Sequence, residues 1–478
     1  MDKKAVAKGF AWNVAFSVPA KLIFPIIGIV ISRKVGTDAL GVFFVIQALF
    51  MFVELLRDGG LGLTYIGDQN MTPEREATYA GTAVMSALLF SVGLLIASPF
   101  LATFNRAPEM NSALLYIAFA VAIGGFITIP VNRLQRDAKF REAGFADFVA
   151  TGVGYVVALT LALLHFGLMS LIIQLLVRVM LYTVLVIRWS GFVVPRFHVK
   201  DGLAIARQSA ANLFSNLAYF VYTSFDYLLI TRVFGKQVNG AYGTAFGFAS
   251  KPVELVTGPL GRTMLIAFSR ASQEPDKQRL LVVRTLGAVA LFVFPLYAII
   301  GAFGHELILW LYGKEFALGG GLLCILSLYL GSRAIGSLAG TALVSSGNAR
   351  WNALSWIPGY AIVIAVVVFV RDPKVEQYVW ALTLGAIAVY ATNVLAVIVR
   401  LKLNREQLGM LGGRAVAALP SIGIIVGTRL LPLPAWLQLT LATVVGGLVQ
   451  VMMVGYMLAQ EPLLAARKGG LRRLLGLF

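Results

Sequence analysis

The stretch from Asn212 to Glu254 decides how this chain is interpreted: NLFSNLAYFVYTSFDYLLITRVFGKQVNGAYGTAFGFASKPVE. Most of it is apolar enough to cross a lipid bilayer, yet polar side chains recur at i, i+4, i+7, i+11 and i+14. They are Asn212, Asn216, Tyr219, Thr223 and Asp226. On a helix they form one polar stripe, and Lys251 and Glu254 share a face of the next helix. Ionisable groups at bilayer depth cost about 2.5–3.5 kcal/mol each, so the rest of the chain is expected to enclose a wet or paired interior.

The composition is that of a polytopic α-helical membrane protein. The chain has 478 residues, of which 59% are hydrophobic and 13% are charged, whereas soluble domains carry about 25% charged residues. Apolar runs of about 20 residues recur from end to end, each long enough to span a bilayer. We therefore expect an all-α fold with about 14 transmembrane helices. The basic, amphipathic N-terminus predicts a first span and no removable signal peptide.

Charge predicts the orientation of these spans. The net charge is +18, and an even number of spans places 25 basic residues on the side of both termini and 9 on the other side. Cytoplasmic loops carry the excess of Lys and Arg, so both termini are expected in the cytoplasm. Contact with anionic membrane lipids follows from the same excess. Nucleic-acid binding is not expected, because the chain has no soluble basic domain. One cysteine, Cys324, and three scattered histidines offer neither a disulfide nor a metal site.

An internal repeat divides the chain. A shift of 199 residues aligns Arg33 with Arg232, Gly36 with Gly235 and Gly41 with Gly240. Such a repeat predicts two pseudo-symmetric six-helix halves of the same orientation. We expect an N-terminal half over 1–190, a cytoplasmic linker over 191–202 and a C-terminal half over 203–405. Two additional transmembrane helices and a basic cytoplasmic tail then occupy 406–478.

One motif points to a family. Ser32-Arg33-Lys34-Val35-Gly36, four residues, then Gly41-Val42-Phe43 is followed by Asp58-Gly59-Gly60-Leu61-Gly62-Leu63. This segment resembles the polysaccharide-transport family of the multidrug/oligosaccharidyl-lipid/polysaccharide exporter superfamily. The second half repeats the pattern with Arg232, Gly235, Gly240 and Tyr242, as a duplicated family member would.

The resemblance implies a flippase and not an enzyme. Such a protein moves an undecaprenyl-diphosphate-linked oligosaccharide across the bacterial inner membrane by ion-coupled alternating access. It implies an H⁺ or Na⁺ gradient in place of a cofactor, and no metal. It also implies a monomer that works beside a polysaccharide polymerase and a chain-length regulator.

Basic residues near the middles of four spans predict a cationic central cavity. They are Lys21, Arg178, Lys251 and Arg333. Arg binds phosphate oxygens bidentately and Lys supplies a point charge, so this set suits a diphosphate. Polar neighbours that suit sugars are Asn13, Ser17, Asn212, Asn216 and Tyr219. The alternative is that each basic group is structural and pairs with an acid or a backbone carbonyl.

Acidic residues are candidates for gating and ion coupling. Glu54, Arg57 and Asp58 lie at the cytoplasmic end of the second span, where Arg57 is expected to pair with Glu54 as a gate. Asp226 is the first candidate for the coupling acid, because burial favours its protonated form, and Glu254 is the second. The alternative for Asp226 is an ion pair with Arg232.

Two other function classes remain open. The first is a multidrug or small-molecule antiporter of the same fold, although a cationic cavity would repel a cationic drug. The second is a membrane polysaccharide polymerase, although the longest outward loop, about 303–318, is short for one. The sequence holds no Walker loop, G-x-S-x-G or H-E-x-x-H motif, which argues against ATP hydrolysis and other catalysis.

Overall fold

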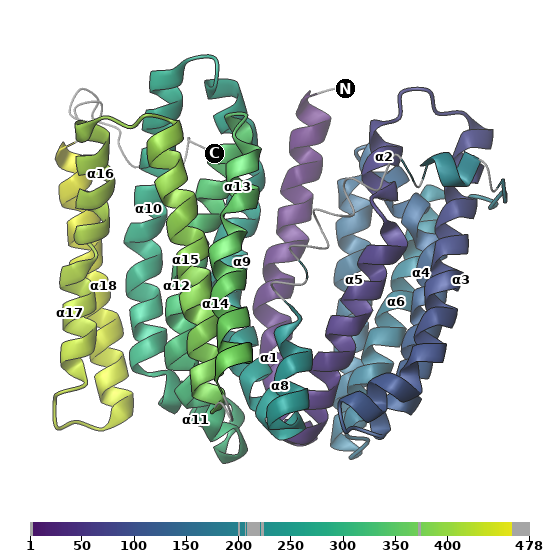
Figure 1. Ribbon diagram of the computed structural model, residues 1–478, viewed down its shortest axis with the longest axis horizontal. Coiled ribbons are helices and arrows are strands. Elements are labelled where there is room, and N and C mark those ends of the chain that lie inside the picture. The colour runs from purple at the N-terminus through teal and green to yellow at the C-terminus, as the bar shows by residue number, and fades with distance from the viewer. Residues whose placement is uncertain are drawn as a thin grey trace. The chain divides into compact units, whose positions relative to one another are not determined.

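The computed structural model describes residues 3–198, 201–205, 207, 220, 224–370 and 374–460. Over these residues the chain is all-α, and ten of the described helices are long and apolar enough to cross a membrane. The all-α polytopic class is therefore confirmed, while the count of 14 helices and the symmetry of two halves stay predictions. The helices are α1 (Lys3–Asp58), α2 (Leu61–Gly67), α3 (Pro73–Phe104), α4 (Glu109–Arg136), α5 (Phe140–Leu163), α6 (Leu168–Ser190), α8 (Asp226–Phe234), α9 (Lys236–Ala271), α10 (Pro275–Ala302), α11 (Gly304–Tyr312), the 3₁₀ turn η1 (Lys314–Phe316), α12 (Ala317–Ser345), α13 (Ala349–Leu354), α14 (Trp356–Phe369), α15 (Val375–Arg400), α16 (Arg405–Val416), α17 (Leu419–Thr428) and α18 (Ala435–Gln460) (Figure 1).

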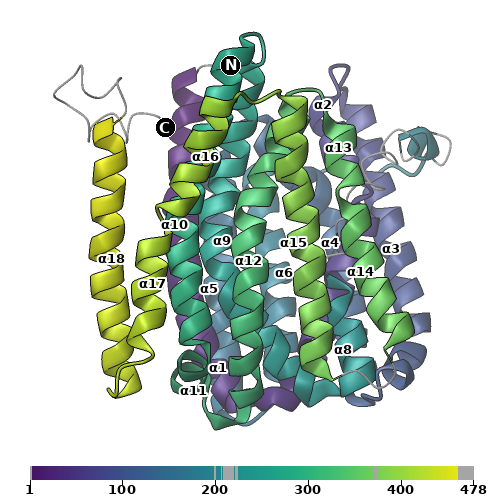
Figure 2. The ribbon, with the colours of Figure 1, turned by 60° about the vertical axis from the view of Figure 1, so that its left-hand side comes forward.

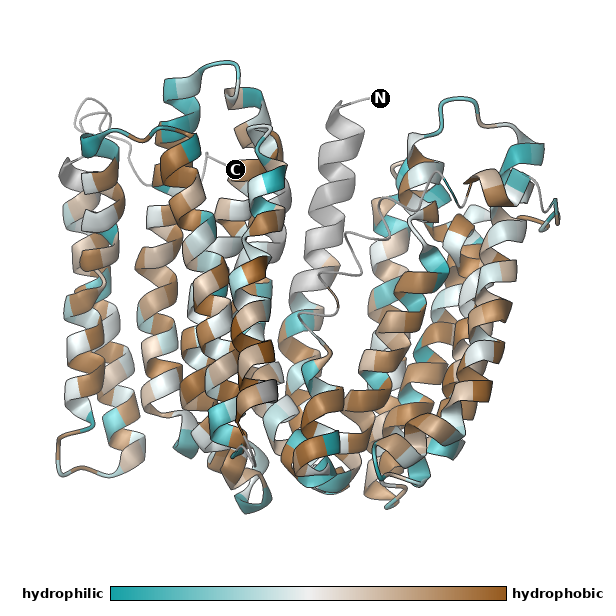
Figure 3. Ribbon diagram, viewed as in Figure 1, coloured by the Kyte–Doolittle hydropathy of each residue, from teal (hydrophilic) through white to brown (hydrophobic). Residues whose placement is uncertain are grey.

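The chain gathers into two compact units. Unit 1 comprises Met1–Thr244 with Leu311–Phe316, and unit 2 comprises Ala245–Trp310 with Ala317–Phe478. Apolar residues follow the helices along most of their length, and polar residues gather toward the helix ends (Figure 3). This distribution is the one that a bilayer imposes on spanning helices.

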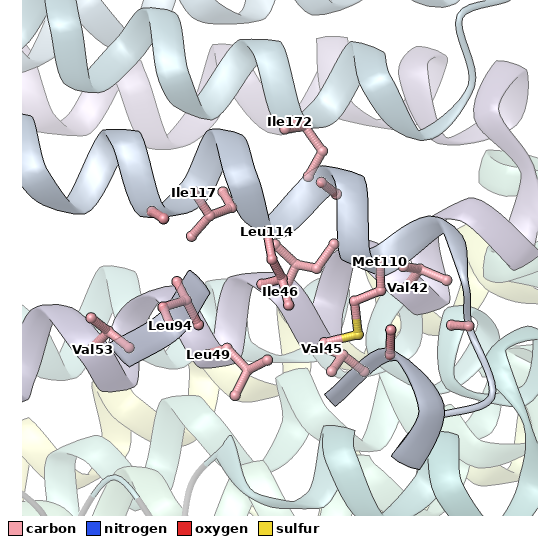
Figure 4. Close-up of a cluster of buried hydrophobic side chains, with 14 of the residues drawn as sticks. Val42, Val45, Ile46, Leu49, Val53, Leu94, Met110, Leu114, Ile117 and Ile172 are labelled. Atoms are coloured by element: carbon pink, nitrogen blue, oxygen red, sulfur yellow. The ribbon is translucent and has the colours of Figure 1, made fainter. Parts of the chain in front are cut away.

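The core of unit 1 lies where the second part of α1 meets α3, α4 and α6. Val45 and Ile46 of α1 are fully buried against Met110 and Leu114 of α4, with Ile172 of α6 beside them (Figure 4). Lipid tails are as apolar as these side chains, so close packing and not escape from water holds such helices together. Small residues allow the close approach: Gly125 of α4 faces Ala87 of α3.

Two glycines bend the chain in the same way. Gly36 interrupts α1 with φ 83° and ψ 169°, and Gly235 separates α8 from α9 with φ 91° and ψ 165°. Only glycine populates this region readily, and another residue there costs about 1–3 kcal/mol. The internal repeat of 199 residues aligns these two positions, and the structure gives them one backbone conformation.

Unit 2 is built on α10, α12 and α15, with α14 packed on α15 and the α17–α18 pair packed on α10 (Figure 2). Pro295 lies inside α10, and proline has no N–H to donate to the carbonyl four residues earlier. That carbonyl belongs to Leu291, and it accepts instead from Gln450 Nε2 of α18 at 2.7 Å. Ser421 of α17 donates to Gln450 Oε1 at 2.7 Å. The Gln450 side chain of the last span therefore replaces the hydrogen bond that the proline removes, and Ser421 holds that side chain in position.

Candidate functional site: polar clusters and a glycine crossing

Unit 1 carries a polar cluster on α5 and α6. Arg178 Nη2 of α6 lies 3.1 Å from Asp147 Oδ1 of α5, and both side chains are about half exposed. Tyr155 of α5 stacks on Phe24 of α1, with 5.3 Å between the ring centroids. Lys21 precedes Phe24 by one turn and is half-buried. The expected basic residues Lys21 and Arg178 thus lie on neighbouring helices, and Arg178 has an acidic partner.

Arg57 lies near the C-terminal end of α1 and against α4. Its guanidinium bonds Glu54 at 3.2 Å, which confirms the expected pair. Arg57 is buried, and its Nε and Nη1 atoms have no hydrogen-bond partner. A Cβ added at Gly124 of α4 would meet the guanidinium, so the glycine makes room for the arginine. Asp58 accepts from the backbone N–H of Gly60 at 3.2 Å and helps to end α1.

Unit 2 carries a second polar cluster, on α9, α10 and α12. Lys251 Nζ lies 3.1 Å from Glu254 Oε2, as their spacing predicts, and Ser250 donates to Glu254 Oε1 at 3.1 Å. Tyr297 of α10 donates a hydrogen bond to the Ala249 carbonyl of α9 at 2.6 Å. A polar stripe follows α12 from the expected Arg333. Arg333, Ser337, Thr341 and Ser345 are half-buried, whereas Ala334, Leu338 and Ala342 between them are buried.

Asp226 begins α8 and is buried. Its Oδ2 accepts a hydrogen bond from the hydroxyl of Tyr242 on α9, and its Oδ1 has no partner. Arg232 instead lies over the ring of Phe104, 5.1 Å from its centroid. The alternative of an Asp226–Arg232 pair is therefore not what the structure records. The structure instead has a hydrogen bond from Tyr242 to Asp226.

The two bends meet at one end of unit 1, which we term the glycine crossing (residues 36–41 and 235–240). A Cβ added at Gly41 would overlap the carbonyl oxygen of Lys236, and one added at Gly240 would overlap the carbonyl oxygen of Thr37. The shift of 199 residues aligns Gly41 with Gly240 and Thr37 with Lys236, so the two contacts are equivalent under the internal repeat. Asn239 Nδ2 also donates to the Gly41 carbonyl at 2.8 Å. Only glycine allows two backbones to approach so closely.

Charged side chains fasten the glycine crossing. Glu315 Oε1 of η1 accepts from both the backbone N–H and the hydroxyl of Thr37, each at 2.8 Å. Thr37 restarts α1 after the bend, so the carboxylate lies at a helix N-terminus, where negative charge is favourable. Lys236 Nζ lies 2.6 Å from Glu109 Oε1 at the start of α4. Both contacts join segments that are far apart in the sequence.

Some expected site residues cannot be placed. The side chains of Asn13 and Ser17, and residues Asn212, Asn216, Tyr219 and Thr223, lie outside the described residues. Sequence reasoning missed Asp147, Tyr242 and Glu315. Asp147 had a usable signal, because it is a lone acid near the start of an apolar span. Glu315 had none, because its partner is 278 residues away.

Comparison with known proteins decides the family. Residues 30–318 match the model of a family described as "Polysaccharide biosynthesis protein". The chain belongs to this family. The expected resemblance is thereby confirmed, over more than half of the chain.

Curated relatives of this family member are distant in sequence. The chain is 23% identical over 338 residues to the succinoglycan biosynthesis transport protein ExoT of Rhizobium meliloti (strain 1021), covering 69% of this chain and 67% of that protein. It is 21% identical over 439 residues to the teichuronic acid biosynthesis protein TuaB of Bacillus subtilis (strain 168), covering 88% of this chain and 89% of that protein.

The fold of this family member is also that of solved transporters. The lipid II flippase MurJ in an inward closed conformation superposes with a TM-score of 0.75 at 15% identity, covering 93% of this chain and 99% of that one. A MATE family multidrug resistance transporter in an inward-facing conformation superposes with a TM-score of 0.61 at 14% identity, covering 80% and 94%.

Proposed function

We propose that this protein is a flippase, and not an enzyme, that moves a lipid-linked oligosaccharide across the bacterial inner membrane. The observation that carries the proposal is the match of 30–318 to the polysaccharide biosynthesis family on a fold shared with a lipid II flippase. The transport role in the name of ExoT supports it. The carrier that we propose is undecaprenyl diphosphate, and both termini lie in the cytoplasm.

The two polar clusters are the proposed substrate contacts. Each of them combines basic groups with hydroxyl groups: Lys21, Arg178 and Tyr155 in unit 1, and Ser250, Lys251 and Arg333 in unit 2. Arginine forms paired hydrogen bonds to phosphate oxygens, and lysine adds a compact charge. Hydroxyl groups exchange donors and acceptors with sugars. Acidic partners such as Asp147 hold the basic groups in position until a phosphate competes for them.

We infer that the glycine crossing is the outer gate. Alternating access requires one end to seal while the other admits substrate, and backbones in contact leave no room for a sugar. The Glu315–Thr37 and Lys236–Glu109 contacts would then break when the outer end opens. Glu54, Arg57 and Asp58 are the proposed inner gate, since Arg57 is a buried and only half-satisfied cation near the C-terminal end of α1.

Coupling to an H⁺ or Na⁺ gradient is proposed to use Asp226. A carboxylate that is buried and has one unpaired oxygen gains from binding a proton or a sodium ion. Tyr242 links Asp226 to α9, close to the glycine crossing, so loading of the acid can bias the gate. Glu254 is the second candidate, although it already pairs with Lys251 at 3.1 Å.

A multidrug antiporter is the second candidate function, because the MATE-like fold also fits the chain. The basic residues of both clusters disfavour a cationic drug. A membrane polysaccharide polymerase is a weaker candidate. We further propose that the protein works as a monomer of two pseudo-symmetric halves, beside a polymerase and a chain-length regulator.

Deletion of the gene tests the proposed function. Cells without the protein should accumulate lipid-linked repeat units that face the cytoplasm and should lose surface polysaccharide. Complementation with Lys21→Glu, Lys251→Glu or Arg333→Glu should fail although each variant reaches the membrane. Normal arrival of lipid-linked units at the outer leaflet in deleted cells, with no paralogue present, would contradict the flippase assignment. A gain in drug sensitivity alone would favour the antiporter.

A further inference from the structure

The segment after α6 exposes large apolar side chains outside the candidate spans. Phe192, Val194, Phe197 and Leu203 are 53%, 68%, 57% and 69% exposed, respectively. The segment connects Ser190 to the short helical stretch 201–205, and no candidate span includes it. Four such side chains within 12 residues form an apolar surface that water solvates poorly.

The backbone of this segment is fixed on unit 1. Arg196 N–H donates to the Ala77 carbonyl of α3 at 2.9 Å, and a Cβ added at Gly81 would overlap the Arg196 carbonyl oxygen. Ile205 is buried in a cluster with Leu61, Tyr65 and Tyr79, against which Val193 packs. The exposed side chains thus project from a fixed backbone, and the stretch 201–205 lies beside the end of α3 (Figures 1 and 2).

The position along α3 indicates the depth. α3 begins at Pro73 with Glu74, Arg75 and Glu76 in its first turn, and its large exposed apolar residues run from Met85 to Phe104. The hydrogen bond at Ala77 therefore lies about 12 Å, at 1.5 Å per residue, before Met85. A bilayer that covers the exposed apolar face of α3 has its headgroup region at the level of the segment.

Charge on the segment matches that location. Arg188, Arg196 and Arg207 are exposed, and Arg188 and Arg196 lie within four residues of the exposed Phe192 or Phe197 in the sequence. Acidic residues nearby are Asp201 and Glu74, and Glu74 pairs with Arg196 only loosely, at 3.9 Å. Basic residues interleaved with aromatic ones are typical of protein surfaces at the membrane interface, where anionic headgroups attract the cations.

We propose that residues 192–198 and 201–203 form an interfacial anchor for anionic lipid. Phe192, Val194, Phe197 and Leu203 enter the boundary between headgroups and acyl chains, and the exposed arginines bind anionic headgroups. The anchor holds the connection between the two predicted halves on one leaflet. It is independent of which substrate the protein carries.

Spin labels measure the proposed depth. In a Cys324→Ser background, single cysteines replace Val194 or Phe197, carry a nitroxide, and are placed in nanodiscs of phosphatidylcholine with or without phosphatidylglycerol. Collision rates with oxygen, which dissolves in lipid, are compared with those of a water-soluble nickel chelate. Gln69→Cys on an exposed loop is the aqueous control, and Leu89→Cys on α3, 69% exposed, is the lipid control.

The expected result is nickel accessibility at 194 and 197 at least severalfold below that at 69, with oxygen accessibility nearer to that at 89. Anionic lipid should increase the depth, and Arg188→Gln combined with Arg196→Gln should remove that increase. Accessibility equal to that at 69 would place the segment in water. Protection from both reagents would place a protein partner there. Depth independent of anionic lipid would remove the headgroup contact. Each of these three results would overturn the proposal.

Discussion

Removal of the Glu315 carboxylate should open the proposed outer gate. Glu315→Ala deletes the acceptor of two hydrogen bonds, from the N–H and the hydroxyl of Thr37, both at 2.8 Å. Hydrogen bonds to charged groups contribute about 1.5–3 kcal/mol each when buried. Glu315 is exposed, so solvent screening reduces the pair to about 1–2 kcal/mol in total. The ratio of open to closed molecules should rise about 5–30-fold.

Distances between spin labels report this change. Cysteines at Thr103 on α3 and Gln237 on α9, both exposed and both in unit 1, are labelled in a Cys324→Ser background. Double electron–electron resonance should show a larger long-distance population for Glu315→Ala. Glu315→Gln should be intermediate, because the amide keeps an oxygen acceptor but loses the charge.

Lys314→Ala, the exposed neighbour, is the matched control and should leave the distances unchanged. If Glu315→Ala gives the wild-type distance distribution in the same lipid, the carboxylate does not hold this end closed. The assignment of an outer gate would then rest on the glycine contacts alone.

Three further changes test other parts of the structure. Gly41→Ala places a Cβ on the Lys236 carbonyl and should destabilise the closed state by about 1–3 kcal/mol, which the same distance measurement between spin labels detects. Gly247→Ala is the control and should have no effect, because its Cβ would meet open space. Asp226→Asn should leave substrate binding intact and make transport in proteoliposomes insensitive to collapse of the H⁺ or Na⁺ gradient; transport that stays fully gradient-sensitive would exclude Asp226 as the coupling acid. Desolvation raises the pKa of Asp68, but hydrogen bonds from Arg75, the Asn70 N–H and Tyr79 outweigh it and hold the pKa below its usual range. The stabilisation from ionised Asp68 is therefore present above the unfolded pKa of about 3.9 and is lost as pH falls through the folded pKa. Asp68→Asn should lower the free energy of unfolding by about 1 kcal/mol at neutral pH, and this difference from the wild type should vanish at low pH in thermal unfolding. A difference that persists at low pH would contradict the role of the ionised carboxylate.

The sequence alone predicts features that depend on local pattern. Apolar run lengths predict the helical class, and the repeated glycines at 36 and 235 mark the two bends. The spacing of Lys251 and Glu254 predicts their ion pair, and the spacing of Glu54 and Arg57 predicts theirs. Both ion pairs follow from helix periodicity, because the two partners of each pair lie within one turn.

Contacts between distant segments could not be predicted from the sequence. Glu315 and Thr37, or Asp147 and Arg178, meet only because the packing of apolar surfaces brings their helices together. An interaction of this kind leaves no periodic signal in a single chain. The first and second spans expected at the N-terminus are two helices within α1, and they are joined directly at the bend of Gly36. Hydropathy finds the break but not the absence of a loop.

The hydrogen bond from Gln450 to the Leu291 carbonyl has a consequence for biosynthesis. Donor and acceptor are separated by 159 residues, and ribosomes add about 5–20 residues per second. Helix α10 therefore enters the bilayer with an unpaired carbonyl at Leu291, which has to persist for roughly 10–30 s until α18 emerges. An exposed polar group in hydrocarbon is costly, so the nascent chain has a reason to keep α10 beside the translocation machinery or a membrane chaperone during that time. The newly made helices would then leave the translocation machinery or the chaperone only after α18, the last span, has been synthesised.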